Sequence, residues 1–215
     1  MDASVGWYDD LCALHGVGSM LADGLWSALD APPPLHSDAV VVEPAVTADQ
    51  VLTRLDGRVH GGVKDSFATM DLSGDGMTLL FSATWIYRGP GRRRTPPAGW
   101  APVTSPAELA TWTGLHDTRE VLLPPLLQRA HFRILAKYAD GRIVAGAVAR
   151  LGSGTVDVSN VYAVAGHHVD WAELADAIGA YFPDRPPVGY ERGDALDAAV
   201  DGGFVPAGDL RVWVR

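Results

Sequence analysis

Three strand-like runs follow one another in the second half of the chain, and their spacing constrains the fold more than any other feature. Residues 132–139, 143–151 and 156–164 are dominated by aliphatic and aromatic side chains. An Asp-Gly pair at 140–141 and a Gly-Ser-Gly run at 152–154 separate them, and short glycine-containing connections of this kind are typical of hairpins. The pattern therefore predicts three consecutive strands joined by tight turns.

A helix and a strand alternate twice after these three strands. Residues 170–181 carry apolar side chains at helical spacing and predict an amphipathic helix. We expect a strand over 187–190, a short helix over 194–201 and a last strand over 210–214. The apolar stripe of the first helix consists of Trp171, Leu174, Ala175, Ile178 and Phe182.

The segment before the three strands completes this α/β pattern. We expect a strand over 101–104 and then a helix over 106–112, because Ser105 and Glu108 form a capping box with proline at the first helical position. A proline pair begins a second helical segment over 124–129. The fold class is therefore predicted to be α/β, with a mixed sheet flanked by helices.

The first part of the chain predicts a less regular arrangement. Residues 7–29 have a helix-like spacing interrupted by glycines, which fits a broken helix or two short ones. The proline run at 32–34 stops any helix. We expect a buried strand over 39–43 and a helix over 48–55 that Thr47 caps.

A hairpin is predicted next, because the Ser-Gly-Asp-Gly run at 73–76 separates strand-like residues 64–72 from 77–88. Both parts of the chain then run strand, helix, hairpin, which suggests a partial, degenerate copy of the second part in the first. The similarity between the two parts is too weak to establish a repeat.

Proline, glycine and arginine dominate residues 89–99, which indicates a linker or an exposed loop. We place the domain boundary there, with one domain over 1–98 and another over 99–215. The three arginines at 92–94 are either solvated at the loop tip or contact an anion or a partner.

Composition excludes several classes of protein. The formal net charge of −9 argues against a protein that binds nucleic acid through its backbone phosphates. No apolar run reaches the roughly 18 residues needed to span a bilayer, and the basic start of a secretory signal is missing, so we expect a cytoplasmic protein that does not insert into membranes. Cys12 is the single cysteine, which rules out an internal disulfide, and its apolar neighbours predict burial.

The order of elements over 100–215, and the helix ending in Gly203-Phe204, resemble the GNAT superfamily of acyltransferases. Four short segments are also similar to uncharacterised actinobacterial GNAT-like proteins: residues 63–67, 85–88, 159–161 and 189–193. The resemblance implies a GNAT-like sheet, with a pocket either between the two halves of the chain or in the splay of the fourth and fifth strands. In this family a Gln/Arg-x-x-Gly-x-Gly/Ala loop holds the pyrophosphate of acetyl-CoA on backbone amides and a helix N-terminus. The matching stretch here, residues 164–171, has one glycine, no leading basic residue, and Asp170 where the phosphates would dock. We therefore expect no cofactor, with a CoA thioester as the alternative.

Two groups of residues are candidates for catalysis. Lys64 and Ser66 share one face of a predicted strand and Asp65 takes the other, so they could hold and orient an anionic group on a substrate. Tyr190 and Glu191 end the strand whose carboxyl edge supplies acids in the resembling family. The structural alternatives are a strand-end salt bridge for the first group and a pair of Glu191 with its neighbour Arg192 for the second.

The remaining candidates would bind substrate. Trp85 and Arg88 could line a pocket, and Arg192 lies beside the second catalytic group; the alternative for the tryptophan is ordinary packing. Three polar residues on the strand that lines the splay complete the set, with satisfaction of the sheet edge as their alternative role: Ser159, Asn160 and Tyr162. No metal is expected, because the adjacent His167 and His168 have no third ligand at a characteristic spacing.

These features favour a small-molecule enzyme on a GNAT-like fold, in bacterial secondary metabolism. The degenerate loop favours CoA-independent elimination or ring closure, with Lys64 or an arginine holding an anionic leaving group and Glu191 or Asp65 as the base. One alternative is an N- or O-acyltransferase that uses acyl-CoA or a carrier protein. Another is a non-catalytic partner subunit or homodimer, docked through the tryptophan-rich N-terminal segment.

Overall fold

The computed structural model describes residues 2–58, 61–91 and 95–215, so the arginine run at 92–94 lies outside the described residues. The chain divides into two compact units: the first contains Met1–Thr84 with Gly208–Arg215, and the second is Trp85–Ala207. The boundary expected from the sequence, between residues 98 and 99, falls inside the second unit. In the described part of the chain, no helix is long and apolar enough to cross a membrane.

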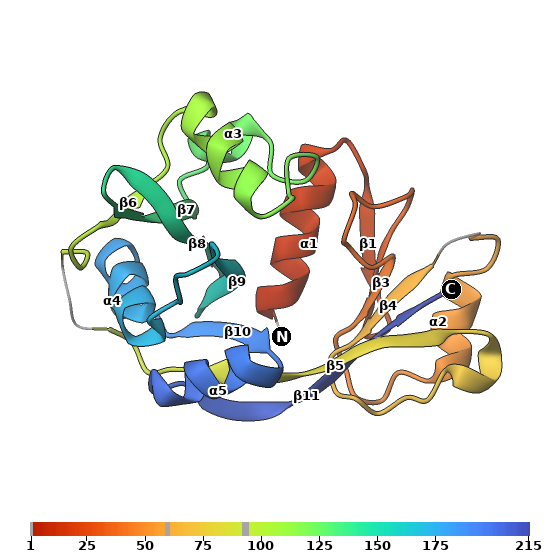
Figure 1. The fold of residues 1–215 in the computed structure, drawn as a ribbon. Coiled ribbons are helices and arrows are strands. Elements are labelled where there is room, and N and C mark those ends of the chain that lie inside the picture. The colour runs from red at the N-terminus through yellow and green to blue at the C-terminus, as the bar shows by residue number, and fades with distance from the viewer. Residues whose placement is uncertain (1, 59–60, 92–94) are drawn as a thin grey trace. The chain divides into compact units, whose positions relative to one another are not determined.

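The second unit is built on the three consecutive strands expected from the sequence. β7 (Phe132–Ala139), β8 (Arg142–Leu151) and β9 (Val156–Ala163) pair antiparallel in that order. β6 (Trp100–Pro102) pairs antiparallel with β7, and β10 (Pro187–Glu191) pairs parallel with β9. The strand order in this unit is therefore β10-β9-β8-β7-β6 (Figure 1).

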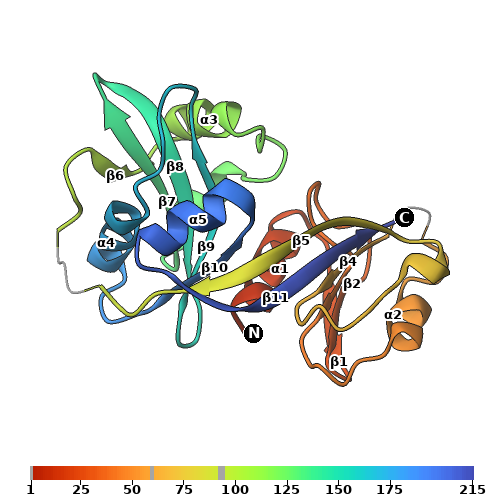
Figure 2. The ribbon, with the colours of Figure 1, turned by 60° about the horizontal axis from the view of Figure 1, so that its bottom comes forward.

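Helices cover both faces of this sheet. They are α3 (Pro106–Leu115), the short 3-10 helix η2 (Pro124–Gln128), α4 (Trp171–Tyr181) and α5 (Gly193–Asp201). Figures 1 and 2 show α4 and α5 together on one side and α3 on the other. The prediction of a mixed sheet flanked by helices is confirmed.

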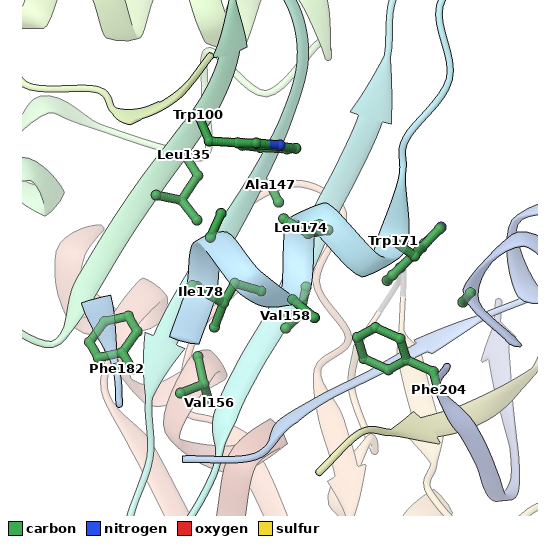
Figure 3. Packing of buried hydrophobic residues seen from close by; sticks show 14 of the residues in the cluster. Trp100, Leu135, Ala147, Val156, Val158, Trp171, Leu174, Ile178, Phe182 and Phe204 are labelled. Carbon is green, nitrogen blue, oxygen red and sulfur yellow. The ribbon is translucent and has the colours of Figure 1, made fainter. Parts of the chain in front are cut away.

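The main core of the second unit lies between α4 and the sheet. The predicted apolar stripe of α4 is buried, and its side chains pack on Val156 and Val158 of β9 and on Leu135 and Ala147 of the neighbouring strands (Figure 3). Each large apolar side chain buried in this way contributes about 1.5–3 kcal/mol. The stripe therefore fixes which face of the sheet α4 covers.

On the other face, α3 is anchored through one tryptophan. The Trp112 Nε1 donates a hydrogen bond to the Leu135 carbonyl oxygen (2.9 Å), and its ring meets the Tyr162 ring edge-on, with centroids 4.9 Å apart. Gly146 lies beneath both rings. A Cβ at Gly146 would stand 2.4 Å from Trp112 Nε1 and 2.6 Å from Tyr162 Cε1, so only glycine fits there.

Replacing Gly146 with Ala should therefore destabilise the second unit. We expect a loss of about 2 kcal/mol in the free energy of unfolding, because two packed rings must shift to admit one methyl group. Urea unfolding would measure the loss. Gly154→Ala is the matched control, since a Cβ at Gly154 meets no atom within 4 Å; equal effects of the two substitutions would contradict the packing argument.

Within the described residues, the first unit consists of two α-helices, one short 3-10 helix and a further group of strands. Its elements are α1 (Asp2–Leu14), β1 (Ser19–Ala22), β2 (Leu25–Ala28), β3 (Ala39–Val41), α2 (Ala48–Arg54), β4 (Gly62–Asp65), η1 (Ser73–Asp75), and most of β5 (Thr78–Tyr87) and β11 (Val205–Val214). The order is β1-β2-β3-β4-β11, with β5 beside β11. The capping box of α2 at Thr47 and the burial of Cys12 are as expected from the sequence.

Residues 19–28 form a hairpin, and the prediction of helix there is wrong. β1 and β2 pair antiparallel around Asp23 and Gly24, whose φ angles are 53° and 74°. Two successive residues of positive φ are the requirement of a type I′ turn, for which Asp-Gly is a favoured pair. The turn signal therefore overrides the helix-like spacing of the apolar residues.

The hairpin predicted over 64–88 is also wrong. β4 ends at Asp65 and pairs with β3 and β11, while β5 lies on the far side of β11. The Asp65 carboxylate accepts hydrogen bonds from the amides of Phe67 (3.1 Å) and Met70 (2.8 Å), and Ala68 has a φ of 52°. These contacts turn the chain out of the sheet before it can continue as a strand.

Candidate active site

The parallel strands β9 and β10 pair only at their beginnings. Their register contains Pro187 with Val156 and Val188 with Asp157, although β9 runs on to Ala163 and β10 to Glu191. The strands are still close at Gly189, where a Cβ would stand 2.8 Å from the Val158 carbonyl oxygen. We call the unpaired ends, residues 159–163 of β9 and 190–191 of β10, the β9–β10 fork.

A β-bulge interrupts β9 within the fork. Ser159 pairs with Val148 and Tyr162 with Gly146, so Asn160 and Val161 together face one residue of β8. Asn160 has a φ of 51°, and its Nδ2 donates to Ser159 Oγ (3.0 Å). A bulge breaks the local ladder and re-aims backbone and side chains, which is why bulges recur beside active sites.

The register also assigns the side chains of β10 to faces of the sheet. Pro187 shares the face of Val156, which packs against α4, and Val188 shares the face of Asp157. Alternation along the strand then places Tyr190 on the face opposite α4 and Glu191 on the α4 face. The side chains of Tyr190 and Glu191 therefore lie on different faces of the sheet.

Glu191 has the electrostatics of an acid or base. Burial raises the pKa of its carboxyl to about 7, and the nearby Arg192 only partly offsets this effect. A carboxyl with such a pKa exchanges its proton near neutral pH, which is the condition for efficient general acid or base catalysis. A raised pKa is compatible with proton transfer by Glu191, and that role stays a prediction.

The structure brings Trp85 and Tyr190 together. Their rings meet edge-on with centroids 5.4 Å apart, one on β5 and the other on β10. The Arg88 amide donates to the Pro187 carbonyl oxygen (3.1 Å), while the Arg88 guanidinium donates to the Ala172 carbonyl oxygen in the first turn of α4 (3.2 Å). Trp85 and Tyr190 thus form one aromatic pair, and Arg88 reaches the start of α4.

Tyr162 belongs to an aromatic cluster and not to an open pocket wall. It is buried, its hydroxyl donates to the Trp112 carbonyl oxygen (3.3 Å), and burial raises its pKa well above the ordinary value. His116 stacks flat on its ring, with centroids 4.8 Å apart. Burial lowers the pKa of His116, which favours its neutral form. Sequence reasoning missed His116 because nothing in its neighbours signals the contact.

The start of α4 has the self-capped form expected from the sequence. The Asp170 side chain accepts a hydrogen bond from the Glu173 amide (2.9 Å), and the His167 amide is bonded to the Val164 carbonyl oxygen (3.0 Å). These amides are therefore occupied, and a carboxylate stands at the end of the helix that attracts anions. That a pyrophosphate group fits poorly there stays a prediction. His167 and His168 are both exposed, and no group of three potential metal ligands occurs in the described ranges.

Lys64, Asp65 and Ser66 lie in the first unit, on and just after β4, and all three are buried. The Lys64 Nζ stands 5.7 Å from the centre of the Tyr8 ring on α1, a cation–π contact. Asp65 is fully buried, and its carboxylate accepts the hydrogen bonds from the Phe67 and Met70 amides described above. The first unit thus gives these residues structural contacts of their own, while Tyr190, Glu191 and the polar residues of β9 are grouped in the second.

No family model and no curated protein matches this chain. Solved structures do match it. A GCN5-related N-acetyltransferase from Kribbella flavida superposes with a TM-score of 0.66 over 100% of this chain and 95% of that chain, at 18% sequence identity. A protein assigned to the GNAT family from Novosphingobium aromaticivorans gives a TM-score of 0.60 over 99% and 96%, at 14% identity.

This chain has the GNAT fold. The prediction from the order of elements is confirmed, and the likeness extends over the whole chain. A functionally unknown conserved protein from Staphylococcus epidermidis has a similar fold, with a TM-score of 0.66, 13% identity, and coverage of 93% of this chain and 94% of that one. The degenerate repeat and the actinobacterial resemblance stay predictions. In the GNAT fold observed here, the β9–β10 fork is the splay that the sequence resemblance implied.

Proposed function

We propose that this chain is a small-molecule acyltransferase that moves an acyl group from a thioester to an amine or hydroxyl. The β9–β10 fork carries the proposal. Two parallel strands separate at the point where a bulge interrupts β9 and where β10 ends in a carboxyl whose pKa is about 7. An opening of this kind can admit an extended substrate between the strands, with a base at its edge.

The proposed chemistry uses the residues of the fork. As the acceptor nitrogen or oxygen attacks the thioester carbonyl, its proton passes to the Glu191 carboxylate. The new bond to the acyl carbon forms, the carbon–sulfur bond breaks, and the sulfur leaves as a thiolate that takes the proton from the Glu191 carboxyl to become the free thiol. Backbone amides at Asn160 and Val161, where the bulge breaks the ladder, are suited to stabilise the negative oxygen of the intermediate.

The α4 N-terminus is relevant to the choice of acyl donor, because the Asp170 carboxylate caps the Glu173 amide there. We therefore propose a donor whose recognition does not depend on a pyrophosphate at α4, such as a thioester on a carrier protein. The test compares acetyl-CoA with acetyl-pantetheine, which has the same thioester without the pyrophosphate, against a panel of small amines and alcohols. We expect turnover of both donors with kcat/KM within about tenfold, since only weak phosphate contacts would be lost.

Each outcome of this comparison is informative. A preference for acetyl-CoA of a thousandfold or so would mean that the phosphates are bound strongly after all, and that our interpretation of Asp170 is wrong. Failure to bind either thioester in calorimetric titration would contradict acyl transfer as a whole.

A second candidate function is the CoA-independent elimination or ring closure favoured by the sequence, in secondary metabolism, and the self-capped α4 is the observation that supports it. Glu191 would remove the proton, and an arginine such as Arg88 would hold the anionic leaving group. Under this alternative, the chain binds neither thioester, yet Glu191→Gln still abolishes turnover of the true substrate.

Changing the charge at position 170 gives a direct prediction. Asp170→Asn keeps a capping side chain but removes the carboxylate, so we expect acetyl-CoA to bind about two- to fivefold more tightly. Calorimetric titration measures the change. The acetyl-pantetheine affinity should not respond, because that donor carries no phosphate charge near the helix; an equal gain for both donors would exclude an electrostatic cause.

A further inference from the structure

We propose a second ligand site in the second unit, a pocket for a small oxyanion carried on an apolar body. The pocket lies between the β6–α3 connection and the η2–β7 connection and has a volume of about 340 Å³. Small-molecule sites begin at roughly this size, about 300 Å³. Its lining combines the buried apolar side chains of Val103, Leu126, Phe132 and Ile134 with two arginines.

The two arginines, Arg129 and Arg133, give the pocket its charge. None of its described lining residues is acidic, although the chain as a whole has a formal net charge of −9. The carboxylate of Glu108 is close in sequence to one wall, but it accepts hydrogen bonds from the Thr104 amide (2.8 Å) and the Tyr138 hydroxyl. A concentrated positive charge in a partly apolar hollow favours a carboxylate or a phosphate.

Arg133 is held in place before any ligand arrives. Its Nη1 donates to the carbonyl oxygens of Ala130 (3.1 Å) and Phe132 (2.5 Å), and its guanidinium carbon lies 5.8 Å from the centre of the Phe182 ring. These contacts fix the plane of a group that has five N–H donors. Little side-chain entropy is then lost when an anion binds, which raises the affinity for a given set of contacts.

The register separates this pocket from the fork. Phe132 pairs with Arg150, which pairs with Asp157, and that row continues to Val188, where β9 and β10 are still joined. The fork belongs to the row of Ala136, Gly146 and Tyr162, four residues further along β7. Four residues of strand span about 13 Å, so the pocket is a distinct site at the closed end of the sheet.

The test titrates the full chain with two probes, benzoate and inorganic phosphate, by calorimetry and by amide chemical shifts. Benzoate presents a carboxylate on an apolar body, and phosphate presents the oxyanion alone. We expect saturable binding of benzoate, with shifts concentrated at residues 102–104 and 126–134. If phosphate binds equally well, the arginines alone select the ligand; if only benzoate binds, the apolar walls take part. Either result supports the site.

Substitutions then locate the binding. Gln128→Glu puts a carboxylate on the exposed rim and should weaken benzoate binding about tenfold or more, as should Arg129→Gln and Arg133→Gln. Ala110→Glu and Arg142→Gln change the charge by the same amounts at exposed positions outside the pocket and should leave binding within about twofold. The proposal is overturned if neither probe binds saturably, if the shifts map elsewhere, or if Gln128→Glu binds as the unmodified chain does. Because Gln128 is exposed, its substitution tests the site even if Arg133→Gln fails to fold.

Discussion

Replacing Glu191 with Gln should lower kcat/KM for acyl transfer by about 10²- to 10⁴-fold, the usual contribution of a general base. The amide keeps the shape of the carboxyl but cannot take a proton. In the unmodified chain, kcat/KM should rise with pH to a plateau, with an inflection near pH 7 that reports the raised pKa of Glu191. The remaining activity of Glu191→Gln should lack this inflection, as steady-state kinetics between pH 5 and 9 would show.

The same substitution should stabilise the fold at high pH, because the folded state holds the Glu191 proton more tightly than the unfolded state does. The ordinary pKa of glutamate is 4.5, and burial raises it to about 7. As the pH rises between these values, the unfolded chain releases the proton first, and stability falls. At pH 8, Glu191→Gln should therefore gain about 2 kcal/mol over the unmodified chain, and at pH 4 the two should be alike.

Glu120→Gln is the matched control, since Glu120 is exposed on the connection after α3. It should change neither the pH profile nor the stability. If Glu191→Gln keeps full activity while still stabilising the chain at pH 8, Glu191 is a buried carboxyl without a catalytic role, and the proposed function loses its base.

Replacing Asp65 with Ala should destabilise the first unit by about 4 kcal/mol. Two backbone amides lose a charged acceptor in a fully buried place, and each such bond is worth about 1.5–3 kcal/mol. Amide hydrogen exchange in β4 and β11 would measure the loss within the first unit. Asp56→Ala, at an exposed position after α2, should have almost no effect.

This prediction also decides between the two roles considered for Asp65. If Asp65→Ala folds with unchanged stability but loses turnover, the carboxylate acts on substrate as the sequence suggested. Loss of stability, with kcat per folded molecule retained, assigns it to the turn that ends β4.

The parts of the fold that could be predicted from the sequence depend on local signals. Glycine-containing turns separate the strands β7, β8 and β9. Asp170 is the N-cap residue of α4, and its position in the sequence predicts where that helix begins. In each case the residues that determine the structure are neighbours in the chain, so the local sequence is enough to predict the turn or the helix start.

The parts that were wrong depend on distant partners or on a stronger competing signal. The stretch after Asp65 has strand-like composition, but β4 finds its neighbours in β3 and β11, and β11 lies about 150 residues later in the chain. At 19–28, an Asp-Gly turn outweighed a helical spacing of apolar residues. Spacing alone could not decide between them.

The candidate site was predictable in position but not in chemistry. The end of β10 marks Glu191 as a candidate, yet its raised pKa comes from burial that only the folded chain produces. The bulge at Asn160 requires the register of β8 against β9, and the stacking of His116 on Tyr162 joins residues 46 positions apart. No sequence signal in this chain specifies either contact.

The division of the chain has a consequence for the order in which it can fold during synthesis. The second unit is one continuous segment, Trp85–Ala207, whereas the first needs its own opening residues together with Gly208–Arg215. A ribosome would therefore release everything the second unit requires before the first unit receives β11, the strand that pairs with β4. Until then β4 presents an open edge to other chains. Residues Gly208–Arg215 cover this edge when β11 pairs with β4. We therefore expect that a chain without these residues aggregates.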